Sequence, residues 1–117
     1  MRNLEERLFS FAVATLKFLR TVKDNYESRV LKHQLVKSST SVGANYEEAQ
    51  GASSRADFNN KIKISLKEIR ETNYWLRIIQ SLELGNKDEC QRLYKESEEL
   101  KKIIGSISSK VSKSLNK

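Results

Sequence analysis

The chain has 117 residues and a mass of 13.5 kDa, and its 22 Lys and Arg residues against 15 Asp and Glu residues give a formal charge of +7 and a pI near 9.6. This length supports one hydrophobic core, and a composition of 38% hydrophobic and 32% charged residues excludes a membrane protein and a disordered acidic chain. The sequence has no proline and four glycines, so it lacks the turn signals that an all-β domain needs about every 8–12 residues.

Apolar residues at helical spacing predict a first helix over residues 3–23 and a second over residues 28–49. The buried face of the first is expected to contain Leu4, Leu8, Phe11, Thr15, Phe18, Leu19 and Val22. The inner face of the second is unusually small and consists of Leu31, Leu35, Ser38, Val42, Asn45 and Ala49. Small side chains lower helix propensity, but they leave room for a neighbouring helix to approach closely.

A third helix is predicted over residues 55–84, because Ser54 is a good N-cap and Asp57 places an acid in the first turn. Gly85 follows where a residue of positive φ ends a helix. The core face of this helix is expected to consist of Phe58, Ile62, Leu66, Ile69 and Leu76.

A fourth helix is predicted over residues 87–112, with Asn86 and Glu89 in a capping arrangement at its start. Its heptad-like stripe contains Leu93, Ser97, Leu100, Ile104, Ile107 and Val111. The Ser- and Lys-rich end is expected to fray. The connections are short, so we expect one all-α domain, an antiparallel up-down four-helix bundle.

The first and third helices carry a second apolar stripe outside the predicted core face. The stripes consist of Phe9, Val13 and Leu16 in the first helix and Ile64, Trp75, Ile78, Ile79 and Leu82 in the third. A monomer seldom leaves such a patch in water, so we interpret the stripes as an oligomer interface. The alternative is a core face that wraps further around a short bundle.

The third helix also has a basic stripe, which is free of acids. It consists of Lys63, Lys67, Arg70, Tyr74 and Arg77. Such an array can neutralise successive phosphates, and an aromatic ring can stack on an unpaired base. Weaker basic features are Arg29, His33 and Lys37 in the second helix and a C-terminal group of Lys101, Lys102, Lys110, Lys113 and Lys117. The alternative is an ordinary solvated face.

Catalytic, metal and cofactor sites find no support in the sequence, so we expect a non-enzymatic protein that needs no cofactor. One histidine and one cysteine, His33 and Cys90, exclude a multi-ligand zinc site. Glu68 and Glu71 have no histidine partner for a di-iron centre, and we expect them to pair with Lys or Arg of a neighbouring helix. The glycines are isolated, so no phosphate-binding loop exists.

The cellular location is expected to be the cytoplasm. The single cysteine cannot form an intrachain disulfide. The uncharged, mostly apolar stretch of residues 8–16 is much shorter than the roughly 20 residues of a membrane-spanning helix. Glu5 and Glu6 stand where a signal peptide has basic residues. We therefore expect no membrane association.

Several short motifs resemble the bacterial four-helix-bundle family, also called the S23 or 23S-rRNA intervening-sequence protein family. They are Gln34-Leu35, the run Ser41-Val42-Gly43-Ala44-Asn45-Tyr46-Glu47-Glu48-Ala49, Asp57-Phe58, Ser65-Leu66-Lys67-Glu68, Glu71 and Tyr74-Trp75-Leu76. The resemblance extends over about residues 5–107. Many members have Ala-Asn-Ile-Ala-Glu-Gly where this chain has the residues from Ala44 to Ala49, which lack the usual glycine.

The resemblance implies an antiparallel four-helix bundle that assembles as a ring-like homopentamer. Some family members are encoded inside insertions of 23S ribosomal RNA genes. A related branch is the accessory protein of diversity-generating retroelements, a basic pentameric barrel that binds nucleic acid and a reverse transcriptase. The matched positions look structural and form no catalytic set.

Residues and resemblance together predict a cytoplasmic homo-oligomer that contacts RNA or DNA phosphates through basic helix faces, with little base specificity. The rival prediction is a protein-interaction scaffold that does not bind nucleic acid directly, for example an accessory protein of a reverse transcriptase or of the ribosome. In that case the apolar stripe faces a different protein, and the charge only keeps the chain in solution. The kind of nucleic acid and the biological process do not follow from the sequence.

Overall fold

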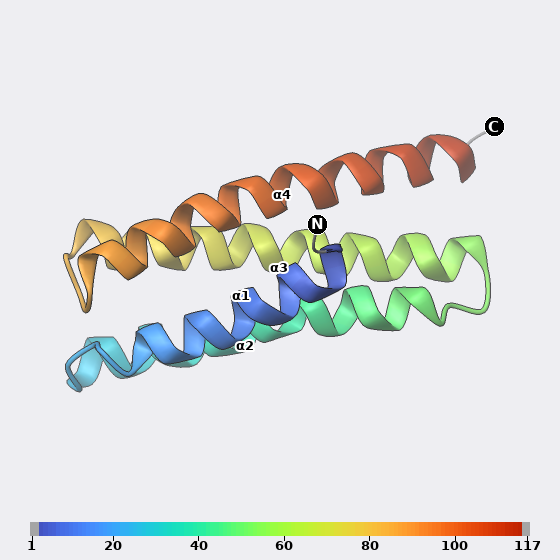
Figure 1. Cartoon of the computed structure of the whole chain (residues 1–117). Helices are drawn as coiled ribbons and strands as arrows, with labels where there is room; N and C mark the ends of the chain where they lie inside the picture. Colours follow the sequence, from blue (N-terminus) through green and yellow to red (C-terminus); the bar gives the residue numbers. More distant parts are fainter. Residues whose placement is uncertain (1–2, 116–117) are drawn as a thin grey trace.

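The computed structural model describes residues 3–115 and contains four helices in chain order. They are α1 (Leu4–Leu19), α2 (Tyr26–Gln50), α3 (Arg55–Ser81) and α4 (Lys87–Leu115). Successive helices lie side by side in opposite directions, and α1 also packs on α4 (Figure 1). The expected all-α up-down bundle is confirmed, and it forms a single body of 49 × 30 × 21 Å.

The core runs along the centre of the bundle and consists mainly of the predicted faces, with Ile79 and Cys90 in addition. Its fully buried members include Leu8, Phe18, Leu35, Val42, Ile62, Ile69, Leu76, Leu100 and Ile104. Leu4, Leu31, Phe58 and Leu66 pack against this core and are half-buried. Burial of these apolar side chains supplies the main driving force for folding.

The α2–α3 contact depends on small side chains, as the sequence suggested. The hydroxyls of Thr72 and Ser38 are 2.9 Å apart, and the Ser65 hydroxyl donates to the backbone carbonyl of Val42 at 2.8 Å. A Cβ atom on Gly43 of α2 would already touch Leu8 Cβ of α1 at 3.4 Å. These bonds satisfy polar groups at a buried contact between helices.

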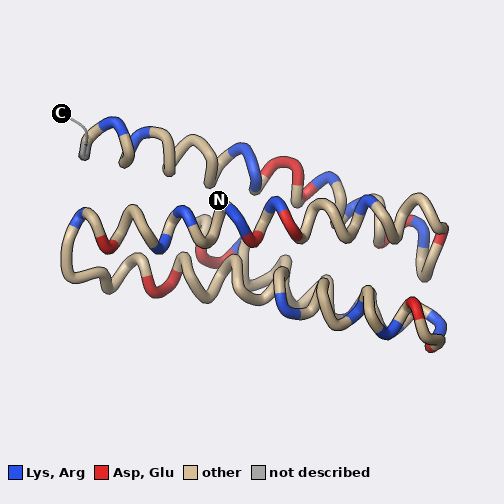
Figure 2. The backbone as a smooth tube through the Cα atoms, turned by 180° about the vertical axis from the view of Figure 1, so that it is seen from behind, with Lys and Arg blue, Asp and Glu red and all other residues tan. Residues whose placement is uncertain are grey.

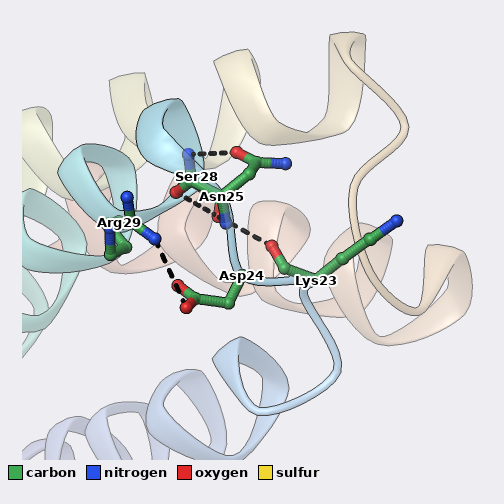
Figure 3. A network of polar contacts seen from close by, with 5 residues as sticks. All are labelled: Lys23, Asp24, Asn25, Ser28 and Arg29. Carbon is green, nitrogen blue, oxygen red and sulfur yellow. Dashed lines mark hydrogen bonds and ion pairs between the residues drawn. The ribbon is translucent and has the colours of Figure 1, made fainter.

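The first helix is shorter than predicted and the second begins earlier. α1 ends at Leu19 because Thr21 and Val22 form a turn, in which the Thr21 hydroxyl donates to the Phe18 carbonyl at 2.7 Å. α2 begins at Tyr26 because Asn25 and Ser28 form a reciprocal capping box. Figure 3 shows this cap, in which each side-chain oxygen accepts from the other residue's backbone N–H at 2.9 Å.

The third helix ends at Ser81, three residues before the predicted end. The chain turns at Glu83, with φ of 58°, and at Gly85, with φ of 70°, so the predicted positive φ of Gly85 is confirmed. A Cβ atom on Gly85 would lie 2.7 Å from Thr21 Oγ1 and 2.8 Å from Val22 Cγ2. Glycine is needed here for conformation and for the close approach of the two turns.

The fourth helix continues to Leu115, beyond the predicted end at residue 112. Up to that residue the chain is helical, and its last turns still contact α3. Ser108 is buried, and the Ser112 hydroxyl donates to Asn59 Oδ1 at 3.3 Å. Lys117 lies outside the described residues.

Candidate nucleic-acid interface and apolar faces

The basic stripe of α3 lies on the surface of the bundle. Lys63, Lys67, Arg70 and Arg77 are all exposed, and the Tyr74 side chain between them is 53% exposed. Within the described residues, none of these four cations forms an ion pair. The stripe therefore presents positive charge without an ion-pair partner among the described residues along about four helical turns.

The basic residues of α2 are exposed as well, but they differ in their surroundings. Arg29 contacts Asp24 at 3.4 Å in an exposed ion pair, which is drawn in Figure 3. Because this charge is partly neutralised, Arg29 should attract a phosphate less strongly. Lys37 and His33 have no such partner among residues 3–115. The Ser38–Thr72 contact places Lys37 level with the middle of the α3 stripe.

Glu68 of α3 is half-buried and interacts electrostatically with Lys67 and Lys37. Burial raises the pKa of its carboxyl group, and the charge of Glu71 raises it further, whereas Lys67 and Lys37 act in the opposite direction. An acid therefore stands beside the candidate interface, in a place where its charged form is disfavoured.

Replacing Glu68 with glutamine is expected to strengthen nucleic-acid binding about two- to fivefold, because one repulsive charge beside Lys67 is removed. The variant is also expected to be more stable at neutral pH. Because folding raises the pKa of Glu68, the folded chain keeps this proton to a higher pH than the unfolded chain does. The wild-type free energy of unfolding therefore falls as pH rises from the ordinary glutamate pKa through the raised one. Chemical denaturation at pH 4 and pH 7 measures the change in the free energy of unfolding, and the variant should lack the part of this change that Glu68 contributes. An equal pH dependence in both chains contradicts it.

The prediction that Glu71 pairs with a cation of another helix is wrong for this structure. Its Oε1 atom accepts a hydrogen bond from the indole N–H of Trp75 at 3.2 Å, within the same helix. The two residues are four apart, so they share one face of α3. Glu68 likewise has no ion pair within the described part of the chain.

The two surplus apolar stripes are only partly covered by the chain itself. Phe9 is 72% exposed and Leu82 is 50% exposed. The half-buried members are Val13, Leu16, Ile64, Trp75 and Ile78. Trp75 packs against the core of its own chain. Ile79, which the spacing placed in the surplus stripe, is fully buried and belongs to the core.

Exposed apolar side chains on α2 were not predicted. Tyr26 is 79% exposed, Val30 is 47% exposed and Val36 is 37% exposed. Tyr26 and Val30 are separated by one helical turn, and this signal was missed because the predicted helix began two residues after Tyr26.

Charge is spread over the whole bundle. Figure 2 shows Lys and Arg positions on all four helices, interleaved with Asp and Glu. The last part of α4 differs, because Lys101, Lys102, Lys110 and Lys113 follow Glu99 without another acid. Lys101 contacts Glu98 at 3.6 Å, so this lysine is partly compensated.

Neither a metal site nor a membrane-spanning helix is found among residues 3–115. No group of three or more His, Cys, Asp or Glu side chains is placed to hold a metal ion. No described helix combines the length and the apolar character needed to span a bilayer.

Comparison with known proteins places this fold in a family. The model of the family described as 23S rRNA-intervening sequence protein matches residues 4–106. A crystal structure of a protein of unknown function from the S23 ribosomal protein family of Bacteroides thetaiotaomicron is similar, with 36% sequence identity and a TM-score of 0.79. The similarity covers 91% of this chain and 98% of that one. No curated protein matches the chain.

Proposed function

The chain belongs to the 23S rRNA-intervening sequence protein family, and we propose that it is a cytoplasmic, non-catalytic homo-oligomer that binds RNA or DNA through the basic stripe of α3. The observation that carries this proposal is the row of four exposed cations, without ion-pair partners in the described part of the chain, with Tyr74 among them. Cations at this spacing release counterions from a phosphate backbone, which gives affinity without reading sequence.

Self-association is part of the proposal, because a single copy leaves Phe9 and Leu82 largely in water. An oligomer repeats the basic stripe, and several weak phosphate contacts on one nucleic acid then act together. The pentamer that the family resemblance implies is one assembly that fits this requirement. A net charge of +7 also favours an anionic partner.

Fluorescence anisotropy with labelled single-stranded RNA, single-stranded DNA and duplex DNA tests the binding directly. We expect saturable binding of at least one of these at physiological salt, with little dependence on base sequence. If none is bound while the protein stays folded, the nucleic-acid proposal fails. The protein-interaction scaffold then becomes the better reading, with Phe9 and Leu82 facing a different protein.

Replacing Phe9 or Leu82 with alanine is expected to shift the solution mass towards one subunit, because each exposed side chain contributes about 1.5–3 kcal/mol when a partner buries it. Light scattering behind a sizing column measures the mass. Tyr26→Ala is the matched control, because Tyr26 is exposed outside both stripes. A wild-type mass of one subunit contradicts the assembly, as does an unchanged mass for both stripe variants.

A further inference from the structure

The position of α1 leaves one end of the bundle with three helices. Arg7, near the start of α1, contacts Glu96 and Glu99 of α4, so α1 begins level with the middle of that helix. The other three helices continue beyond this level, as Figure 1 shows. About three turns of α4 therefore have no described part of α1 beside them. Phe58 and Val111, which a fourth helix would cover at this end, stay half-buried.

An open hollow of about 310 Å³ lies in this part of the bundle, between the first turn of α3 and the last turns of α4. We call it the α3–α4 hollow. It is lined by Arg55 and Phe58 of α3 and by Lys110, Val111 and Ser114 of α4. Its volume is at the lower end of the range of about 300–1,000 Å³ that is typical of small-molecule sites. Because the hollow is open, a molecule in solution can reach its side chains.

The charged side chains of the α3–α4 hollow are both cationic. Arg55 and Lys110 are exposed, and neither forms an ion pair among the described residues. Arg55 also stands in the first turn of α3, where the helix dipole favours an anion and disfavours a cation. A guanidinium group can donate two parallel hydrogen bonds to a carboxylate. An anion beside Arg55 is therefore stabilised by the side chain and by the end of the helix.

The acids of the neighbouring segments do not line the hollow. Asp57 of α3 accepts from the backbone N–H of Ser53 at 3.2 Å. Glu48 of α2 pairs with Lys61 at 3.3 Å. In the described part of α4 no acid follows Glu99. The positive charge of Arg55 and Lys110 is therefore not balanced by a carboxylate of the hollow itself.

We propose that the α3–α4 hollow binds a small organic acid, with a carboxylate head held by Arg55 and Lys110 and an apolar body against Phe58 and Val111. The head gains two charge-assisted contacts, and the body displaces water from the apolar wall. A neutral molecule of the same shape lacks the first gain, and an organic cation is repelled by both side chains. The site is separate from the basic stripe of α3, so its test does not depend on nucleic-acid binding.

The probe is 3-phenylpropionate, and 3-phenylpropan-1-ol and 3-phenylpropylammonium are its neutral and cationic counterparts. Titration of the isotope-labelled full chain, followed by NMR at the Val111 methyl groups, reports binding in the hollow. We expect saturable shifts with the acid and an affinity at least about fivefold above that of the alcohol, because two exposed ion pairs are gained. Acetate, which has the head without the body, is expected to bind at least about tenfold more weakly than the acid.

The double variant Arg55→Gln/Lys110→Gln is expected to bind the acid no better than the alcohol. Both side chains are exposed and have no ion-pair partner among residues 3–115, so the fold should be kept. Lys102→Gln/Lys113→Gln is the matched control, because these two lysines of α4 are exposed and do not line the hollow. This control removes the same charge and should retain the preference for the acid.

Four results overturn the proposal. Equal affinity for the acid and the alcohol shows that the cations do not select the ligand, and equal affinity for the acid and acetate shows that the apolar wall does not contribute. Equal losses in the two double variants show that binding follows net charge. The absence of saturable shifts at Val111 shows that the hollow is not occupied by the acid.

Discussion

Replacing Leu35 with alanine is expected to lower the free energy of unfolding by about 2–5 kcal/mol, which is a large share of the stability of a domain of this size. Leu35 is fully buried, where α2 faces the centre of the bundle. Its removal leaves a cavity that the packed helices cannot close without losing other contacts.

The next residue along the chain is a matched control. Val36 is 37% exposed, so Val36→Ala is expected to cost less than about 0.5 kcal/mol, as is usual for surface sites. Urea denaturation of the two variants measures both values. Similar losses at the two positions contradict the orientation of α2 described above.

Charge reversal at Lys67 and Arg70 is the second large effect. The double variant Lys67→Glu/Arg70→Glu is expected to bind nucleic acid about a hundredfold more weakly, since two charge-assisted contacts worth about 1.5 kcal/mol each are lost. Both side chains are exposed and unpaired within the described residues, so helicity should not change. Fluorescence anisotropy and circular dichroism measure the two properties.

A control for this variant must change the net charge by the same amount at another place. Lys23 and Lys95 are exposed, lie outside the α3 stripe and form no ion pair within residues 3–115. Lys23→Glu/Lys95→Glu should therefore reduce binding only slightly, through the weaker overall field. Equal losses in the two double variants show that binding follows net charge and not the α3 stripe.

The helical core was predictable because its cause is local. A repeat near 3.6 residues determines which side chains share a helix face, and the predicted residues Leu8, Ile62, Ile69 and Leu100 are indeed buried. The positive φ of Gly85 and the cap at Ser54 also follow from the chemistry of one or two residues.

Helix ends were less predictable, because they depend on competition between neighbouring bonds. The apolar spacing continues through Val22, which is buried. The helix nevertheless ends at Leu19, where the Thr21 hydroxyl donates a hydrogen bond to the Phe18 carbonyl. Ser28 was read as the start of α2, and it instead completes the capping box with Asn25.

The surface was least predictable, because it depends on how each helix is rotated against its neighbours. Spacing alone placed Ile79 and Trp75 on the same surplus stripe, but Ile79 is in the core and Trp75 is half-buried. The Asn86 N–H donates to Thr21 Oγ1, which is distant in sequence, so no local pattern predicts this contact.

The dependence of nucleic-acid affinity on salt tests the central claim most directly. If the four cations of the α3 stripe each neutralise one phosphate of a single strand, the slope of log K against log salt is about −3 for one subunit and steeper for an oligomer. The Lys67→Glu/Arg70→Glu chain should give a slope shallower by about 1.4. A wild-type slope near zero, or the same slope in both chains, contradicts phosphate binding by this stripe.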